Sequence, residues 1–359
     1  PGLGRTAPPG RRRRMLTYWG LYLSAAVMAV GYQGTRGRGT LLIWWVLAFL
    51  FVLAIGLRFE VGCDWLAYIR YYRRIDGVSF AELWALSDPG YQFFNWFSNL
   101  FDWKVYGVNV ISAAVFMTGL VIFCRAQPYP WLALAVAVPY IVVVVSMGYT
   151  RQAVAIGLVF WALKCLEDAR VQKFLVLVSL ATLFHKTAVL MIPLGLFLFG
   201  RGWAVRALAI VLVGAGLWAA FVADYQADLW ENYVMADMRS AGARVRVLMN
   251  LVPALILLVF WRRWKTVYPN STIWLWMAFA AILCLPLLSL ASTATDRIAL
   301  YLTPLQIVVF SRLPALLHQR DLRNLAVLGI LAGYALVLFV WLNYARHAGC
   351  WVPYDNLLY

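Results

Sequence analysis

Cationic, acidic and tyrosine side chains recur at the ends of apolar segments along this chain. Arginine binds phosphate and diphosphate because its planar guanidinium presents N–H donors that match pairs of anionic oxygens. Ionisable groups at the ends of apolar helices are costly unless they are paired, hydrated or functional. Gathered at one place, they would bind an anion and transfer a proton. The candidates are Arg58, Asp64, Tyr68, Asp88, Tyr91, Tyr149, Arg151, His185, Lys186, Asp296, Arg297, Arg346 and His347.

The first candidates lie in the run from Arg58 to Tyr68. Gly62 permits a turn directly after an apolar segment. Asp64 and Tyr68 are four residues apart and would share one face of a following helix. The carboxylate of Asp64 would then accept a proton from a sugar hydroxyl or hold an arginine. Arg58 would either bind an anion or extend to the lipid headgroups.

Two further candidates stand where helices begin. Asp88 precedes Pro89 and Gly90, which favours a capping role for it over the stretch 89–101, with substrate contact as the alternative. Arg151 begins an apolar segment just after Tyr149. A cation there opposes the positive end of the helix dipole but suits a bound anion, so Arg151 is predicted to be functional.

His185 and Lys186 interrupt the apolar segment 173–199 near its middle. Because a charge at mid-bilayer is costly, we expect two short helices, 173–185 and 187–199, that meet at the membrane interface. Broken helices surround ligand sites in membrane proteins, which favours catalysis or substrate contact for His185 over a structural role. In the pair Asp296-Arg297, the arginine would supply another group that donates hydrogen bonds to an anion. Asp296 would be a helix cap or an arginine partner.

The C-terminal segment from Trp341 to Tyr354 is rich in aromatic residues. They would form either an aromatic belt at the membrane interface or a stacking surface for sugar rings. Cys63 and Cys350 fall on the same side of the predicted topology. The two alternatives for this pair are a disulfide bond and two free thiols. The five cysteines form no CxxC motif and only three histidines occur, so no metal site is predicted.

The elements that must position these residues are membrane-spanning helices. Of 359 residues, 64% are hydrophobic and only 13% are charged, and the mean hydropathy is +0.76. A span needs about 20 apolar residues, so we expect an all-α polytopic integral membrane protein with about 11 to 12 transmembrane helices. The expected segments are 16–33, 40–57, 104–124, 130–148, 151–166, 173–199 as a broken hairpin, 204–222, 246–261, 272–292, 297–317 and 324–345.

Charge asymmetry predicts the orientation of a single integral domain, residues 15–359. One side carries long loops, 58–103 and 223–245, in which acidic and basic residues balance. The other side carries short loops that are basic, and short basic loops face the cytoplasm. The net charge of +16 therefore reflects topology, and nucleic acid is not an expected partner. The basic residues of the short loops are Arg36, Arg38, Arg125, Lys164, Arg170, Lys173, Arg201, Arg206, Arg262, Arg263, Lys265, Arg312, Arg320 and Arg323.

The basic run Arg11 to Arg14 disagrees with this orientation because it falls on the outer side. Met15 as a natural start would make residues 1–14 an extension outside the domain. The alternative is a cytoplasmic tail with a re-entrant first span.

Six short motifs in order resemble the EpsG family of Wzy-like polysaccharide polymerases, and the similarity runs from about residue 18 to the C-terminus. Cys63 departs from the family pattern, where a small hydroxyl residue is expected, but Asp64 and Tyr68 remain. The motifs are Arg58 with Gly62-Cys63-Asp64 and Tyr68, Asp88-Pro89-Gly90-Tyr91, Arg151-Gln152 with Ala155, Phe184 to Leu190, Asp296-Arg297, and Trp351-Val352-Pro353-Tyr354.

The resemblance implies a bacterial inner-membrane glycosyltransferase with a GT-C-like fold. Such enzymes join repeat units carried on undecaprenyl pyrophosphate at the periplasmic face, in exopolysaccharide, capsule or O-antigen synthesis. It implies no cofactor and metal-independent catalysis, with a divalent cation as the alternative. The implied partners are the lipid-linked glycan donor and acceptor, membrane lipids and a chain-length regulator (copolymerase).

The expected reaction is attack by an acceptor sugar hydroxyl on the anomeric carbon of the lipid-linked donor. His185 is the first candidate for the general base and Asp64 the second. A flippase or exporter for lipid-linked oligosaccharide, and a ligase that transfers a single unit, are the alternative functions. The expected diphosphate ligands are Arg58, Arg151, Arg297 and Lys186, and the expected substrate contacts are Tyr68, Asp88, Tyr91, Tyr149 and Asp296.

Overall fold

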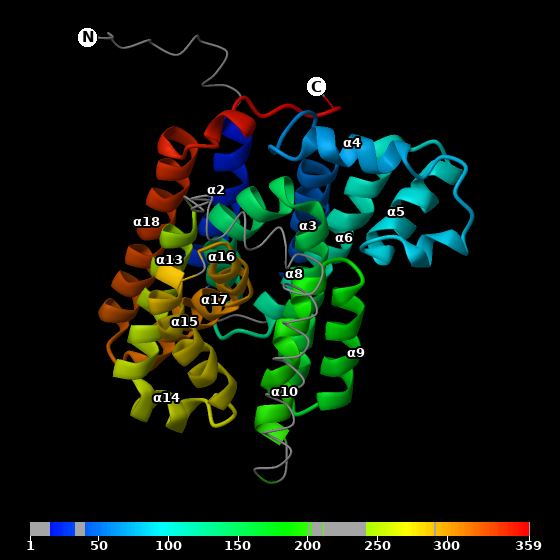
Figure 1. Cartoon of the computed structure of the whole chain (residues 1–359). Helices are drawn as coiled ribbons and strands as arrows, with labels where there is room; N and C mark the ends of the chain where they lie inside the picture. Colours follow the sequence, from blue (N-terminus) through cyan, green and yellow to red (C-terminus); the bar gives the residue numbers. More distant parts are fainter. Residues whose placement is uncertain are drawn as a thin grey trace.

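The computed structural model describes residues 15–32, 40–199, 202, 211, 242–290 and 292–358. All regular secondary structure in these ranges is helical, apart from a single bridge between Arg58 and Asn356. The predicted all-α membrane fold is confirmed (Figure 1). Residues 1–14 and the predicted span 204–222, except for residue 211, lie outside the described ranges.

Within the described ranges the helices follow one another with short connections. Their bounds are α2 Leu16–Gly31, α3 Leu41–Gly56, α4 Trp65–Arg73, η2 Glu82–Ala85, α5 Pro89–Leu100, α6 Lys104–Arg125, α7 Pro130–Ala137, the π-helix η3 Val138–Ser146, α8 Thr150–Glu167, α9 Val171–Thr182, η4 Lys186–Met191, α10 Ile192–Phe199, α13 Ala243–Val259, α14 Trp261–Val267, α15 Thr272–Leu290, α16 Ser292–Tyr301, α17 Pro304–Arg312, η7 Leu313–Leu316, α18 Arg320–Tyr344 and η8 Ala348–Cys350.

Four helical segments of the described chain are long and apolar enough to cross a membrane, or five if one bent pair counts as a span. The other apolar helices are shorter, so any count of 11 to 12 spans has to include broken and short elements. The four segments are Lys104–Arg125, Thr272–Ser289, Ala294–Leu316 and Arg320–Tyr344, the bent pair is Ala243–Val259 with Trp261–Val267, and the shorter helices are Leu16–Gly31, Leu41–Gly56, Pro130–Ser146, Val171–Thr182 and Lys186–Gly195.

The buried helix α8 lies at the centre of the bundle and packs against α6 and α9. The α6–α8 contact depends on two glycines: a Cβ added to Gly119 would lie 1.8 Å from the backbone oxygen of Gly157. The two backbones can therefore approach closely only because neither residue carries a side chain. This contact fixes α8, whose first turn carries Arg151.

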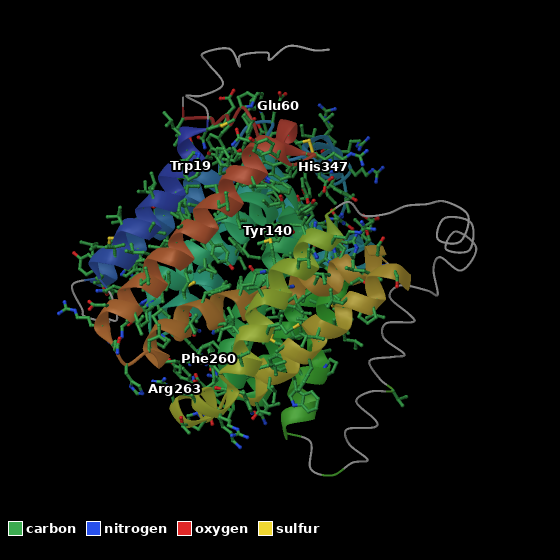
Figure 2. All side chains as sticks on the ribbon, turned by 90° about the vertical axis from the view of Figure 1, so that its left-hand side faces the viewer. Trp19, Glu60, Tyr140, Phe260, Arg263 and His347 are labelled. Atoms are coloured by element: carbon green, nitrogen blue, oxygen red, sulfur yellow. A yellow bond between two sulfur atoms is a disulfide. The ribbon has the colours of Figure 1, made fainter. Side chains whose placement is uncertain are left out.

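The segment 173–199 is broken, as predicted: α9 ends at Thr182, and η4 begins at Lys186. His185 adopts an extended backbone conformation between the two helices. At α13–α14 the chain bends by 78°, and α14 carries the predicted basic loop 262–265 as a short helix. Figure 2 shows Arg263 and Phe260 at one end of the molecule, with Glu60 and His347 at the opposite end.

The C-terminal segment packs against the turn that follows α3 and is linked to it covalently. Cys63 and Cys350 form a disulfide, which was one of the two alternatives for this pair, and the backbone N–H of Gly62 donates to the Cys350 carbonyl at 2.8 Å. Trp351 and Tyr354 are each 1% exposed, and the indole N–H of Trp351 donates to the carbonyl of Val143. For these two residues both expected roles, interface belt and sugar stacking, are wrong because their rings are packed inside the protein.

Candidate active site

A polar cavity of about 170 Å³ lies where five separate segments of the chain meet. It includes the start of α4, the start of α8, the break after α9, the first turn of α13 and the second turn of α16. Seven of the residues expected at the site line it, together with three others. The lining residues are Asp64, Tyr68, Tyr149, Arg151, Gln152, His185, Arg246, Asp296, Arg297 and Leu300.

The turn at Gly62 delivers the carboxylate of Asp64 to this cavity. Gly62 has a φ of +99°, and a Cβ there would lie 2.5 Å from the Met147 oxygen, so the turn requires glycine. Asp64 and Tyr68 both face the cavity from the start of α4, as their spacing predicted. Within the described part of the chain, the Asp64 carboxylate makes no hydrogen bond or ion pair. Burial raises the pKa of Asp64, opposed by the charges of Arg151 and Arg297.

Arg151 is held in place by an acid and an aromatic ring from the neighbouring outer segments. Its Nη1 lies 2.5 Å from Oδ2 of Asp88, and its guanidinium carbon lies 4.8 Å from the centre of the Tyr71 ring. The prediction that Asp88 caps the helix over 89–101 is wrong: its side chain makes no capping hydrogen bond, because it pairs with Arg151 instead. Asp88 positions Arg151 without lining the cavity.

A second ion pair brings in an arginine that sequence reasoning missed. Nη1 of Arg246, in the first turn of α13, lies 2.5 Å from Oδ2 of Asp296, and its guanidinium lies over the ring of Tyr140. Asp296 is thus an arginine partner, as one alternative held, but not a cap, because α16 begins earlier at Ser292. The signal for Arg246 was present: it opens an apolar helix, as Arg151 does.

Arg297 and His185 are joined at the third corner of the cavity. Nη1 of Arg297 donates to Nε2 of His185 at 3.2 Å, which leaves the proton of the neutral imidazole on Nδ1. Nδ1 lies 2.6 Å from the Thr187 hydroxyl, which donates in turn to Tyr301. Burial, followed by the charges of Arg297, Arg151 and Lys186, lowers the pKa of His185 to about 3. The imidazole is therefore neutral at physiological pH.

Four expected site residues lie outside the cavity: Asp88, described above, and Arg58, Tyr91 and Lys186. Arg58, expected to bind the diphosphate, points into the protein instead. It is 1% exposed and donates to the carbonyls of Ile55 and Val61 and to the side chains of Thr150 and Asn109. Because these acceptors occupy its guanidinium, it is not placed to bind a diphosphate. Tyr91 is buried beneath the cavity wall, with its ring centre 5.7 Å from that of Tyr68, and Lys186 is exposed on η4.

The arrangement combines anion binding with proton acceptance. Three guanidinium groups from α8, α13 and α16 line one small cavity with the Asp64 carboxylate, which makes no hydrogen bond or ion pair to a described residue. An ion pair with one carboxylate oxygen uses only part of the five N–H donors of an arginine, so donors remain for a ligand. Among the described residues, no group of three or more His, Cys, Asp or Glu side chains is arranged to hold a metal ion.

Comparison with known proteins identifies one relationship. The model of the EpsG family matches residues 41–356, which is most of the chain. No curated protein and no solved structure matches.

Proposed function

This chain belongs to the EpsG family, a family of Wzy-like polymerases, and on that premise we propose that it polymerises lipid-linked oligosaccharide repeat units. The donor is a glycan on undecaprenyl pyrophosphate, and the acceptor is a second unit on the same kind of lipid. The short basic loops favour an orientation in which the cavity faces away from the cytoplasm, and in a bacterial inner membrane that side is the periplasm.

In the proposed reaction a hydroxyl of the acceptor sugar attacks the anomeric carbon of the donor. The bond between that carbon and the diphosphate oxygen breaks, a glycosidic bond forms, and undecaprenyl diphosphate leaves. Negative charge grows on the leaving oxygen as the bond breaks. Arginines already held in position stabilise that charge more in the transition state than in the ground state. Arg151, Arg246 and Arg297 take this role.

We assign the general base to Asp64. The observation that carries the proposal is that this carboxylate has no hydrogen bond or ion pair to any described residue, yet shares the cavity with three arginines. It can accept the hydroxyl proton without first giving up a partner. His185, the first candidate from the sequence, already accepts a hydrogen bond at Nε2 from Arg297 and resists protonation. We therefore give His185 the role of positioning Arg297.

The test is a reconstituted reaction. Purified protein in nanodiscs is supplied with an undecaprenyl-pyrophosphate-linked repeat unit, and the glycans are separated by size. Polymerisation gives a ladder of longer glycans. Asp64→Asn should lower the rate by about 10²- to 10⁴-fold, which is the usual effect of losing a general base. The matched control is Asp76→Asn, a change to an exposed carboxylate of the same outer segment, which should leave the ladder intact.

Other outcomes identify other functions. Transfer of a single unit to a different acceptor lipid indicates a ligase. In sealed proteoliposomes, movement of the lipid-linked glycan across the bilayer without any new glycosidic bond indicates a flippase. Near wild-type polymerisation by Asp64→Asn would exclude Asp64 as the base.

A further inference from the structure

Seven aromatic rings form a continuous surface on the outer segment between α4 and α6. Neighbouring rings are in contact: Phe97 lies 5.2 Å from Phe101, Phe101 lies 4.9 Å from Trp103, and Phe80 lies 5.5 Å from Trp96, measured between ring centres. This ring surface runs from the segment before η2, along α5, to the residue before α6. Its members are Phe80, Trp84, Phe93, Trp96, Phe97, Phe101 and Trp103.

On α5 the ring surface occupies the outward face. The inward face is already occupied, because Tyr91, Phe94 and Ser98 are buried and α5 packs against α4 and α6. Trp84 remains 56% exposed and Phe101 54% exposed. A contiguous apolar patch is rare on a surface that faces water and marks an interaction site.

Chain connectivity brings this surface to one end of α6, a helix long and apolar enough to span the membrane. The spanning helix α6 has 22 residues, which at about 1.5 Å per residue matches a hydrocarbon thickness of about 30 Å. Lys104 and Arg125 stand at its two ends, where charged side chains reach the headgroups. Trp103 directly precedes Lys104, so the ring contacts from Trp103 to Phe97 begin at that interface. Figure 1 shows α5 extending sideways beside α6.

We propose that the ring surface is inserted into the membrane interface around the N-terminal end of α6. Residues 79–103 then form a wing that rests in the lipid headgroup region, rather than a loop in water. Tryptophan suits this region because its apolar ring carries an N–H that can face the polar border, and phenylalanine supplies apolar rings for the side that faces the acyl chains. The occupant of the surface is thus the lipid bilayer itself.

The wing is connected to the cavity wall at its inner end. The backbone N–H of Gly90 donates to the carbonyl of Leu183 at 2.9 Å, two residues before His185, and Asp88 pairs with Arg151. The depth at which residues 79–103 insert therefore determines where Arg151 and the break before His185 lie relative to the membrane surface. The insertion itself does not depend on the proposed reaction.

Spin labels measure the depth directly. Single cysteines replace Trp84, Phe101 or, as the control, exposed Asp76, in protein that keeps the Cys63–Cys350 disulfide and has Cys124, Cys165 and Cys284 changed to Ala. The labelled proteins are placed in phosphatidylcholine nanodiscs, and their collisions with oxygen and with a water-soluble nickel chelate are compared. We expect oxygen to dominate at positions 84 and 101, and the nickel chelate to dominate at position 76.

Two results would overturn the proposal. Nickel accessibility at 84 and 101 equal to that at 76 would place the wing in water. Spin–spin broadening that disappears in discs holding one copy would make a second copy of the chain the occupant. A second measurement needs no variant: a phosphatidylcholine with a diazirine on its acyl chain should label residues 79–103 of the wild-type protein. The lipid-facing helix α18 serves as the positive control, and labelling of α18 without labelling of 79–103 would also refute insertion.

Discussion

Nη1 of Arg297 lies 3.2 Å from Nε2 of His185 and donates a hydrogen bond to it. The nitrogen that would have to accept a proton in catalysis therefore already accepts a hydrogen bond from a guanidinium. A base in that position must first lose this contact and then become charged beside two other cations, Arg151 and Lys186. The relationship separates the roles of His185 and Asp64, and the following predictions depend on it.

The first prediction concerns His185. His185→Ala should lower polymerisation about 10- to 100-fold because Arg297 loses one charged hydrogen bond, whose worth is about 1.5–3 kcal/mol. His185→Gln should retain activity within about tenfold of wild type, since an amide oxygen near the position of Nε2 still accepts from Arg297. Initial rates with the lipid-linked unit measure both. Equal losses above about 10³-fold in the two variants would make His185 the base.

The second prediction concerns pH. The base must be ionised, and burial raises the pKa of Asp64, so kcat/KM should fall as the pH drops through a midpoint above the ordinary aspartate value of about 3.9. His185, with its pKa lowered to about 3, stays neutral across this range and should add no inflection near pH 6.5. Rate profiles from pH 4 to 8 check the sign. If the midpoint of the pH profile shifts in His185→Gln and does not shift in Asp64→Glu, Asp64 is not the base.

The third prediction separates a structural arginine from the functional ones. Arg58→Ala should destabilise the protein by at least about 3 kcal/mol, because it leaves buried acceptors such as Thr150 Oγ1 without a donor. Arg297→Ala should unfold near the wild-type temperature but lose polymerisation. Thermal unfolding in detergent, together with the ladder assay, distinguishes them, and exposed Arg74→Ala serves as the neutral control. A stable, folded but inactive Arg58→Ala would return Arg58 to the site.

The fourth prediction tests the arginine that the sequence reading overlooked. Arg246→Ala should weaken binding of the product, undecaprenyl diphosphate, at least tenfold, because one of the three guanidinium groups is lost. Arg244→Ala, an exposed change in the same first turn of α13, is the matched control. Product inhibition of the polymerase or calorimetry in nanodiscs gives the affinity. Unchanged affinity in Arg246→Ala would restrict this residue to holding Asp296.

Much of the architecture follows from residue type and order. Apolar runs of membrane length predicted the helices, the charged pair His185-Lys186 predicted the break between α9 and η4, and Gly62 predicted the turn before α4. These features are local: they depend on hydration cost and backbone sterics over a few residues. The sequence also indicated that Asp64, Arg151, His185 and Arg297 belong together, and all four line one cavity.

Pairing and exposure were decided only by the tertiary structure. Arg58 and Arg246 are both arginines beside apolar helices and look equivalent in the sequence. In the structure, Arg58 donates its hydrogen bonds to buried acceptors, whereas Arg246 lines the cavity. The side chain of Asp88 pairs with Arg151, 63 positions away in the sequence, and does not cap the helix that follows it. Which way a side chain points depends on how each helix is rotated in the bundle, and which partner it meets depends on segments far apart in the chain. Sequence determined where the charges lie along the helices, and packing determined which of them remain available to a substrate.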